Sequence, residues 1–268
     1  MAQEKNMPNG EGEMTFWEHL AAFRALLVRT ALVLLVIAIV AFVFKDFIYN
    51  NILLAPRNRD FITNRLFCHL GYCINEHTFK IINIDLSGQF TSSIMISSIA
   101  GLVVGFPYLV FELWLFIKPA LYEHEQKGIK GFVFFTSVLF FVGVGFGYFI
   151  IVPLIVEFFS TYLLSEQIEN TIQLSSFLSN ILMTCLASGI VFELPVLIYF
   201  LTKVGILTPS FLRKYRRYAI VLIFFIGAVI TPPDVMSQLI VSIPLWMLYE
   251  ASILISVRVY KKRMKIAG

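Results

Sequence analysis

The chain has 268 residues, of which 58% are hydrophobic and only 14% are charged. Soluble domains carry about 25% charged residues, so this composition excludes an ordinary soluble protein and predicts an integral membrane protein in contact with lipid. The net charge is a modest +4, and we expect no nucleic-acid partner.

The N-terminal residues are polar and acidic, and they lack the basic start and the small-residue cleavage site of a removable signal peptide. We therefore expect them to belong to the mature protein. No linker, repeat or low-complexity tract divides the rest of the chain. The sequence predicts three parts: a cytoplasmic segment at 1–24, a six-helix membrane domain at 25–257 and a basic cytoplasmic tail at 258–268.

Six uncharged apolar runs follow in chain order, and each is expected to cross the membrane as an α-helix. A crossing needs about 20 residues for about 30 Å of hydrocarbon. The fifth run is shorter, because the 16 residues from Tyr218 to Pro233 give roughly 24 Å of helix and two prolines end it. We expect the sixth helix to be short as well, because Glu250 limits its apolar core; a re-entrant hairpin of both runs is the alternative. The expected spans are 30–44 with 25–29 added, 86–111, 131–156, 170–192 continued past Glu193, 218–230, and 235–249 continued to 257.

The basic residues indicate the orientation of these spans. Of the 21 lysines and arginines, sixteen fall on one side of a six-span chain and five on the other. Loops that stay in the cytoplasm carry an excess of lysine and arginine. We therefore expect both termini in the cytoplasm, together with the connection 118–130, and a bacterial inner membrane as the location.

Proline occurs inside four of the expected spans. A proline in a lipid-embedded helix kinks it and frees carbonyl groups that neighbouring helices must satisfy. Four kinked helices favour a concave shape over a straight bundle, although proline is also common in ordinary membrane helices. The four residues are Pro107, Pro153, Pro195 and Pro244.

Glu193 is the most costly side chain of the spans. It lies about two-thirds along the fourth span, where a carboxylate costs a few kcal/mol unless it faces water or other helices. Asp234 and Gln238 follow the fifth run and are one helical turn apart. The three residues could form a polar patch that hydrogen-bonds a guest transmembrane helix. The alternatives are an internal partner for Glu193 and a helix N-cap role for Asp234.

Two cysteines, Cys68 and Cys73, lie in the long loop after the first span. In an oxidising compartment they could form a disulfide. Free thiols are the alternative, and metal binding with His69 and His77 fits no strong zinc spacing. Cys185 is expected to pack within the fourth span. The sequence contains no nucleotide-binding loop, metalloprotease motif or nucleophile–histidine frame, so we expect neither an enzyme nor a cofactor.

The connection KPALYEHEQKGIK at 118–130 mixes three lysines with two glutamates. One interpretation is a solvated loop in which Glu123 and Glu125 pair with Lys127 and Lys130, which contributes little at a surface. The other is a binding site whose carboxylates receive a cationic ligand. The residues alone leave both interpretations open.

Four segments, in this order, resemble the C subunit of the twin-arginine protein translocase, the TatC family. They are FWEHLAAFRALL before the first span, FIKPALYEHEQK after the second, FELPV in the fourth and TPPDVMSQ after the fifth. The similarity extends from about residue 16 to residue 258. It implies a six-helix protein shaped like a cupped hand, with both termini in the cytoplasm and without hydrolytic activity.

The resemblance also implies a function. The protein would bind the twin-arginine signal peptides of folded cargo at its cytoplasmic face, and the proton-motive force would drive transport. It would work in an oligomeric receptor complex with single-span TatA- and TatB-type subunits. Their membrane helices would dock on the polar patch of Glu193, Gln238 and Asp234.

Glu125 matches the glutamate with which the family binds the signal peptide. Two adjacent guanidinium groups need fixed carboxylates, with which the planar fork of arginine pairs bidentately. Neighbouring residues would shape the turn and the membrane edge. The expected signal-peptide site comprises Glu125, Glu18, Phe116, Pro119, Leu121, Tyr122, His19 and Arg24.

One position departs from the family pattern. The family has roughly His-Leu-x-Glu-Leu-Arg before the first span, whereas this chain has HLAAFR, so that Ala22 stands where the acid is expected. Glu18 lies one helical turn earlier. Our hypothesis is that Glu18 supplies the missing carboxylate.

Two other functions remain open. A secondary transporter could use Glu193 for proton coupling, but many such folds consist of two related halves, and the sequence shows no internal repeat. A membrane scaffold that only organises other proteins is the second alternative.

Overall fold

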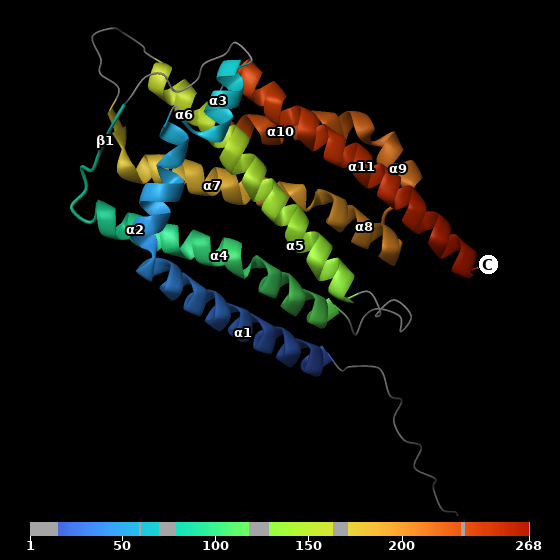
Figure 1. The fold of residues 1–268 in the computed structure, drawn as a ribbon. Helices are drawn as coiled ribbons and strands as arrows, with labels where there is room; N and C mark the ends of the chain where they lie inside the picture. The colour runs from blue at the N-terminus through green and yellow to red at the C-terminus, as the bar shows by residue number, and fades with distance from the viewer. Residues whose placement is uncertain are drawn as a thin grey trace, which may run out of the picture.

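The computed structural model describes residues 16–58, 60–69, 79–117, 129–162, 171–231 and 234–267. Most of them lie in long helices that run side by side through the molecule (Figure 1). Among the described residues, five helical segments are long and apolar enough to cross a membrane. They are His19–Val43, Gly88–Ile117, Gly131–Thr161, Leu174–Val204 and Ser237–Met264.

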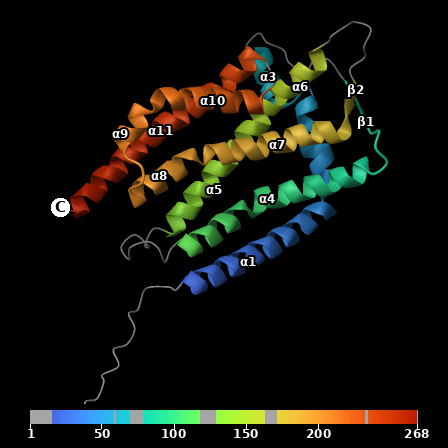
Figure 2. The same cartoon turned by 180° about the vertical axis from the view of Figure 1, so that it is seen from behind.

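The first two long helices form an antiparallel pair at one edge of the molecule. Helix α1 (Phe16–Val43) lies alongside α4 (Gly88–Ile117) in both views (Figures 1 and 2). Glycines allow this close approach: a Cβ atom at Gly101 would lie 2.9 Å from the backbone of Ala38, and one at Gly105 would overlap a leucine of α1. Much of the remaining apolar surface of α1 is exposed, which suits contact with lipid.

The third long segment is built from three consecutive helical elements. Helix α5 (Ile129–Phe146) continues through a π-helical turn, η5 (Gly147–Ile151), into α6 (Val152–Thr161). Pro153 is the second residue after the π turn and has no amide hydrogen to donate. The wider turn therefore precedes the position where the regular hydrogen-bond ladder is interrupted.

The fourth long segment is bent at the acidic residue inside it. Helix α7 (Leu174–Phe192) ends at Glu193, and α8 (Leu194–Val204) starts directly after it. Pro195 at the start of α8 removes one helical hydrogen bond and crowds the preceding turn. The predicted kink in this span is therefore present, and Glu193 lies at it.

The centre of the fold lies where α5, η5 and α7 cross. The hydroxyl group of Ser188 donates a 2.7 Å hydrogen bond to the carbonyl oxygen of Gly143, which joins α7 to α5. A side chain at Gly143 would collide with Phe192, so the helices can pack this closely only with glycine there. The side chains of Phe140, Ile151, Val152, Leu178 and Ile181 are fully buried in this region.

The last helices confirm one length prediction and contradict another. After α9 (Pro209–Lys214), α10 (Arg216–Ile230) has only 15 residues, as expected. The sixth helix is not short: α11 (Val235–Ala267) has 33 residues. Glu250 does not limit it, because the carboxylate pairs with Arg216 of α10 at 2.7 Å, and a paired charge is compatible with a membrane helix.

Several helix ends meet at one end of the molecule, which we call the terminal end. It contains the start of α1, the end of α4, the start of α5, the end of α8 and the C-terminal part of α11 (Figures 1 and 2). The two ends of the described chain therefore lie at the same end of the bundle. The expected signal-peptide residues of α1 and α4 lie there as well.

The opposite end carries short elements, which include two strands that were not predicted. Each strand has only three residues, too few for a recognisable alternation in the sequence. They pair in parallel, with Lys80 opposite Thr171, and join the segments that precede α4 and α7. The elements are α2 (Lys45–Phe47), η1 (Ile48–Leu53), η2 (Ala55–Arg57), α3 (Ile62–His69), β1 (Lys80–Ile82) and β2 (Thr171–Gln173).

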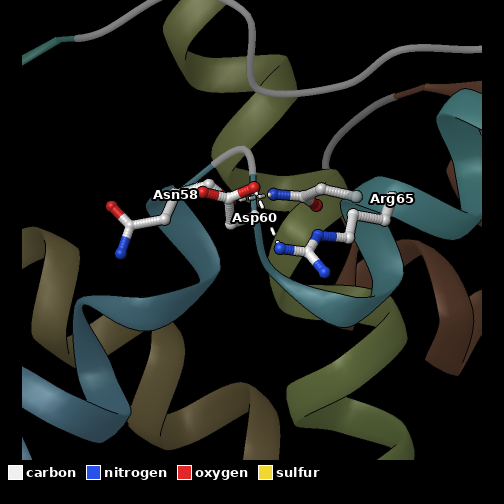
Figure 3. A network of polar contacts seen from close by, with 4 residues as sticks. Asn58, Asp60 and Arg65 are labelled. Carbon is white, nitrogen blue, oxygen red and sulfur yellow. Dashed lines mark hydrogen bonds and ion pairs between the residues drawn. The ribbon is translucent and has the colours of Figure 1, made fainter.

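Polar contacts fold the segment between η2 and α3 (Figure 3). Asp60 accepts a 3.1 Å hydrogen bond from Arg65, and both side chains are exposed. The buried side-chain amide of Asn64 donates to the carbonyl oxygen of Asn58 at 2.8 Å. The exposed ion pair contributes little, whereas the buried NH₂ group of Asn64 fixes the turn, because leaving this donor unpaired would be costly.

Candidate functional site

The central loop of the predicted signal-peptide site lies outside the described residues. The structure fixes where this loop leaves and re-enters the fold, because α4 ends at Ile117 and α5 begins at Ile129, both at the terminal end. Glu18 lies in the first turn of α1, but its side chain is outside the described part. The predicted residues of the loop itself are Pro119, Leu121, Tyr122 and Glu125.

The structure brings two predicted site residues together from different helices. The imidazole ring of His19 on α1 stacks on the ring of Phe116 on α4, with 4.4 Å between the ring centroids. Phe23, one helical turn after His19, lies 5.4 Å from the same ring. We call these three residues the aromatic cluster; it closes the α1–α4 pair at the terminal end.

Arg24 is the other predicted site residue of α1 whose side chain the structure describes. Arg24 is exposed, and no ion pair links it to another described residue. Ala22 is half-buried, whereas Leu26 and Thr30, one and two turns later, are buried. Since residues four apart share a helix face, Ala22 belongs to the stripe of α1 that faces inward. The acid of the family pattern would therefore have stood on this inward stripe.

Sequence reasoning missed a buried carboxylate on α4. Glu112 is only 4% exposed. Its Oε1 atom accepts a 2.8 Å hydrogen bond from the hydroxyl group of Tyr108, and its Oε2 atom lies 3.4 Å from the guanidinium of Arg29 on α1. The α1–α4 pair therefore contains an acid, an arginine and a phenol within about two turns of the aromatic cluster.

A signal for this site was present in the sequence. Arg29 marks the charged edge of the first span, and Glu112 directly follows Phe111, where the second expected span stopped. Consecutive spans run antiparallel, so the start of the first and the end of the second meet. If the two edge charges are expected to pair, Glu112 no longer ends the second span. The span then continues to Ile117, where α4 ends.

The predicted polar patch is not assembled as expected among the described residues. The Oδ2 atom of Asp234 accepts a 2.8 Å hydrogen bond from the amide of Ser237, the N-cap arrangement that was the alternative. Gln238 donates to the carbonyl oxygen of Phe224 on α10 at 3.2 Å. Neither oxygen atom of Glu193 accepts a hydrogen bond from a described residue, so no hydrogen bond joins the three residues into one patch.

Helix register explains why Glu193 and Gln238 do not meet. The hydroxyl groups of Thr202 on α8 and Ser256 on α11 lie 2.9 Å apart, and the two helices run in the same direction (Figure 1). Counting back nine residues from each places Glu193 level with Met247. Gln238 lies nine residues before Met247 in α11, roughly 13 Å away along the helix axis.

The carboxylate of Glu193 has no hydrogen-bond partner among the described residues. Both of its oxygen atoms are hidden from solvent, and neither accepts a hydrogen bond from another described residue. An unpaired carboxylate inside a membrane span is costly, and such residues typically mark a binding or transport function. Glu193 therefore remains the strongest candidate on this side of the molecule, as a separate site from Gln238 and Asp234.

The cysteine prediction is tested only at one of its two residues. Cys68, at the end of α3, is disulfide-bonded, whereas Cys185 is a buried free thiol in α7. Cys73 and His77 lie outside the described residues, so the pairing of Cys68 with Cys73 stays a prediction. Within the described part of the chain, no three histidine, cysteine or carboxylate side chains gather as a metal site.

Comparison with known proteins places the chain in one family. The family model described as Sec-independent protein translocase protein (TatC) matches residues 18–244. The TatC protein of Blattabacterium sp. subsp. Periplaneta americana (strain BPLAN) is 38% identical over 266 residues, which cover 96% of this chain and 100% of that protein. The TatC protein of Helicobacter pylori (strain ATCC 700392 / 26695) is 45% identical over 182 residues, 68% of this chain and 72% of that protein.

Solved structures agree with the sequence comparison. A crystal structure of a twin arginine translocase receptor, TatC, superposes with a TM-score of 0.70 at 30% identity and covers 90% of this chain and 99% of that chain. A second crystal structure of that receptor, in DDM, gives a TM-score of 0.72 at 30% identity, over 89% of this chain and 99% of that one. This chain therefore belongs to the TatC family of Sec-independent protein translocase proteins and is a multi-pass membrane subunit of that translocase.

Proposed function

We propose that this chain is the receptor subunit of the twin-arginine translocase and binds the signal peptides of folded cargo. The observation that carries the proposal is the α1–α4 pair at the terminal end. There the aromatic cluster and the buried carboxylate of Glu112 flank the point where the loop with Glu125 leaves α4. The solved structures that this chain resembles are those of a receptor, which supports the same role here.

The side chains at the terminal end of the α1–α4 pair suit a ligand with two neighbouring arginines. Each guanidinium group is planar and can donate two parallel hydrogen bonds to one carboxylate, which an ammonium group cannot do. Aromatic rings such as those of His19 and Phe116 can stack against a guanidinium or an apolar side chain beside it. A site of this kind would distinguish arginine from lysine.

For the topology, we infer six crossings in a cupped arrangement, with both termini in the cytoplasm of a bacterium. Helix α10 would make the fifth crossing with only 15 residues, which a locally thinned bilayer accommodates. The excess of basic residues on the side of the termini supports a cytoplasmic location. The common position of the two ends of the described chain (Figure 2) supports an even number of crossings.

For the partners, we infer that single-span TatA- and TatB-type subunits dock near Glu193 in an oligomeric complex. A hydroxyl or amide group of a guest helix could donate to the unpaired carboxylate, and such bonds between membrane helices are favourable. The same carboxylate would also suit a proton-coupled transporter. That function and a pure scaffold are therefore the alternatives that an experiment must separate.

Peptide binding separates these functions. The full chain in lipid nanodiscs is titrated with a fluorescent peptide that carries either a twin-arginine or a twin-lysine motif. We expect the twin-lysine peptide to bind at least about tenfold more weakly, because hydrogen bonds to charged groups contribute about 1.5–3 kcal/mol each. Equal affinity for both peptides, as a small-solute transporter or a scaffold predicts, would overturn the receptor proposal.

Glu18 is expected to contribute to the same binding. If it replaces the acid that is missing at Ala22, Glu18→Gln should weaken peptide binding and cargo export about as much as Glu125→Ala. The measurement is the affinity for the twin-arginine peptide together with export of a folded reporter. Normal export by the Glu18→Gln variant would refute the substitute role.

A further inference from the structure

The buried Glu112 carboxylate has one oxygen that is not fully satisfied. Its Oε1 atom accepts the hydrogen bond from Tyr108, whereas Oε2 is hidden from solvent and accepts no hydrogen bond from any described residue. A buried carboxylate is stable only if opposite charge and hydrogen bonds replace its water. One such contact is therefore still missing at Oε2.

The internal cation near this oxygen holds it only loosely. The guanidinium of Arg29 lies 3.4 Å from Oε2 without a hydrogen bond, and the Arg29 side chain is 59% exposed. Because this guanidinium is more than half exposed and donates no hydrogen bond, it replaces the lost water of Oε2 only in part. The long side chain of Arg29 can therefore move into the solvent or headgroup region while Glu112 stays in place on α4.

Glu112 lies against the stripe of α1 that lacks the family acid. Gly101 of α4 is packed on Ala38, and Gly105 is packed one turn earlier on α1, so the two helices stay in antiparallel register. The same register brings Phe116 to Phe23. Glu112 is one turn from Phe116, roughly 6 Å deeper in the pair. It therefore presents a carboxylate to the face of α1 on which Ala22 lies.

These observations point to a direct role for Glu112 in the receptor site. We infer that Glu112 is a second anionic contact for the twin-arginine ligand, where a ligand guanidinium displaces Arg29 and donates to Oε2. This inference rests on the proposed function and adds a residue to its site. The aromatic cluster, one turn nearer the terminal end, would border the path of the arginine side chain.

The test uses the full chain in nanodiscs and four peptides, with RR, RK, KR or KK at the two motif positions. The variant Glu112→Gln keeps an acceptor for Tyr108 and removes only the charge. We expect it to bind the RR peptide about tenfold more weakly than the wild type, as for the loss of one charge-assisted contact. The preference for arginine over lysine should disappear at one of the two positions and persist at the other.

Arg29→Gln separates a binding role from a structural one. Both substitutions break the Arg29–Glu112 ion pair, so a strut between α1 and α4 would respond alike to both. If Glu112 binds the ligand, Arg29→Gln removes a competitor, and binding should be unchanged or up to about fivefold tighter. Weaker binding of the RR peptide by both variants would overturn the inference. If the Glu112 variant fails to fold, weaker binding by Arg29→Gln is enough to overturn it.

Glu250→Gln is the matched control. Glu250 also pairs with an arginine, Arg216, and also has one hidden oxygen without a hydrogen bond, but it lies in the α10–α11 pair at the other edge of the molecule (Figure 1). Its affinity for the RR peptide should equal that of the wild type. If the wild type binds all four peptides alike, the receptor proposal itself fails. If the wild type prefers arginine at both positions and Glu112→Gln keeps that preference at both, with unchanged affinity for RR, only the present inference fails.

Discussion

Replacement of Glu125 by alanine should abolish export of folded cargo and lower the affinity for a twin-arginine peptide by about 10- to 100-fold. The variant loses a carboxylate that can accept two parallel hydrogen bonds from one guanidinium, and hydrogen bonds to charged groups contribute about 1.5–3 kcal/mol. The measurements are complementation of an export-deficient strain and peptide titration of the purified protein. The preference for arginine over lysine should be lost at one of the two motif positions and should persist at the other, where Glu112 is proposed to bind.

The neighbouring Glu123 provides the control for this result. Both glutamates lie in the same short loop with the same three lysines, so a solvated loop predicts a small effect from either substitution. A specific site predicts that Glu123→Ala exports cargo nearly as well as the wild type. Equal and small effects of the two substitutions would favour the solvated loop and contradict a site centred on Glu125.

Replacement of Glu193 by alanine should leave peptide binding intact and weaken recruitment of the single-span partner subunits by roughly 3- to 30-fold. The estimate corresponds to one hydrogen bond between membrane helices, about 0.6–2 kcal/mol. Recruitment is measured by crosslinking of the partner helices to the α7–α8 bend in membranes. Unchanged crosslinking to both partners would refute a docking role for this carboxylate.

The structure suggests a further comparison in the same crosslinking experiment, between single and double variants of Glu193 and Gln238. Because Glu193 and Gln238 lie at different depths, Glu193→Gln and Gln238→Ala should act independently, and their effects should add in the double variant. Glu193→Gln keeps hydrogen-bonding capacity and should retain most of the recruitment. Strong non-additivity would instead mean that a guest helix brings the two residues into one site.

The sequence determined the features that depend on local composition. Each expected span is a run of apolar residues whose transfer into lipid is favourable by itself, and all six expected runs became helices. The shortness of α10 was equally local, because two prolines follow one residue after its end. The motifs around Glu125 and in FELPV identified the family without any three-dimensional information, since they are continuous in the chain.

Only the tertiary structure decided the features that depend on charges far apart in sequence. Glu250 did not shorten α11 and Glu112 did not end α4, because each is paired with an arginine of another helix. Conversely, Glu193 and Gln238 fit one patch by composition, yet the register of α8 against α11 separates them. The free energy of a charge in a membrane depends on its partner, and which helices lie side by side, and in what register, determines that partner.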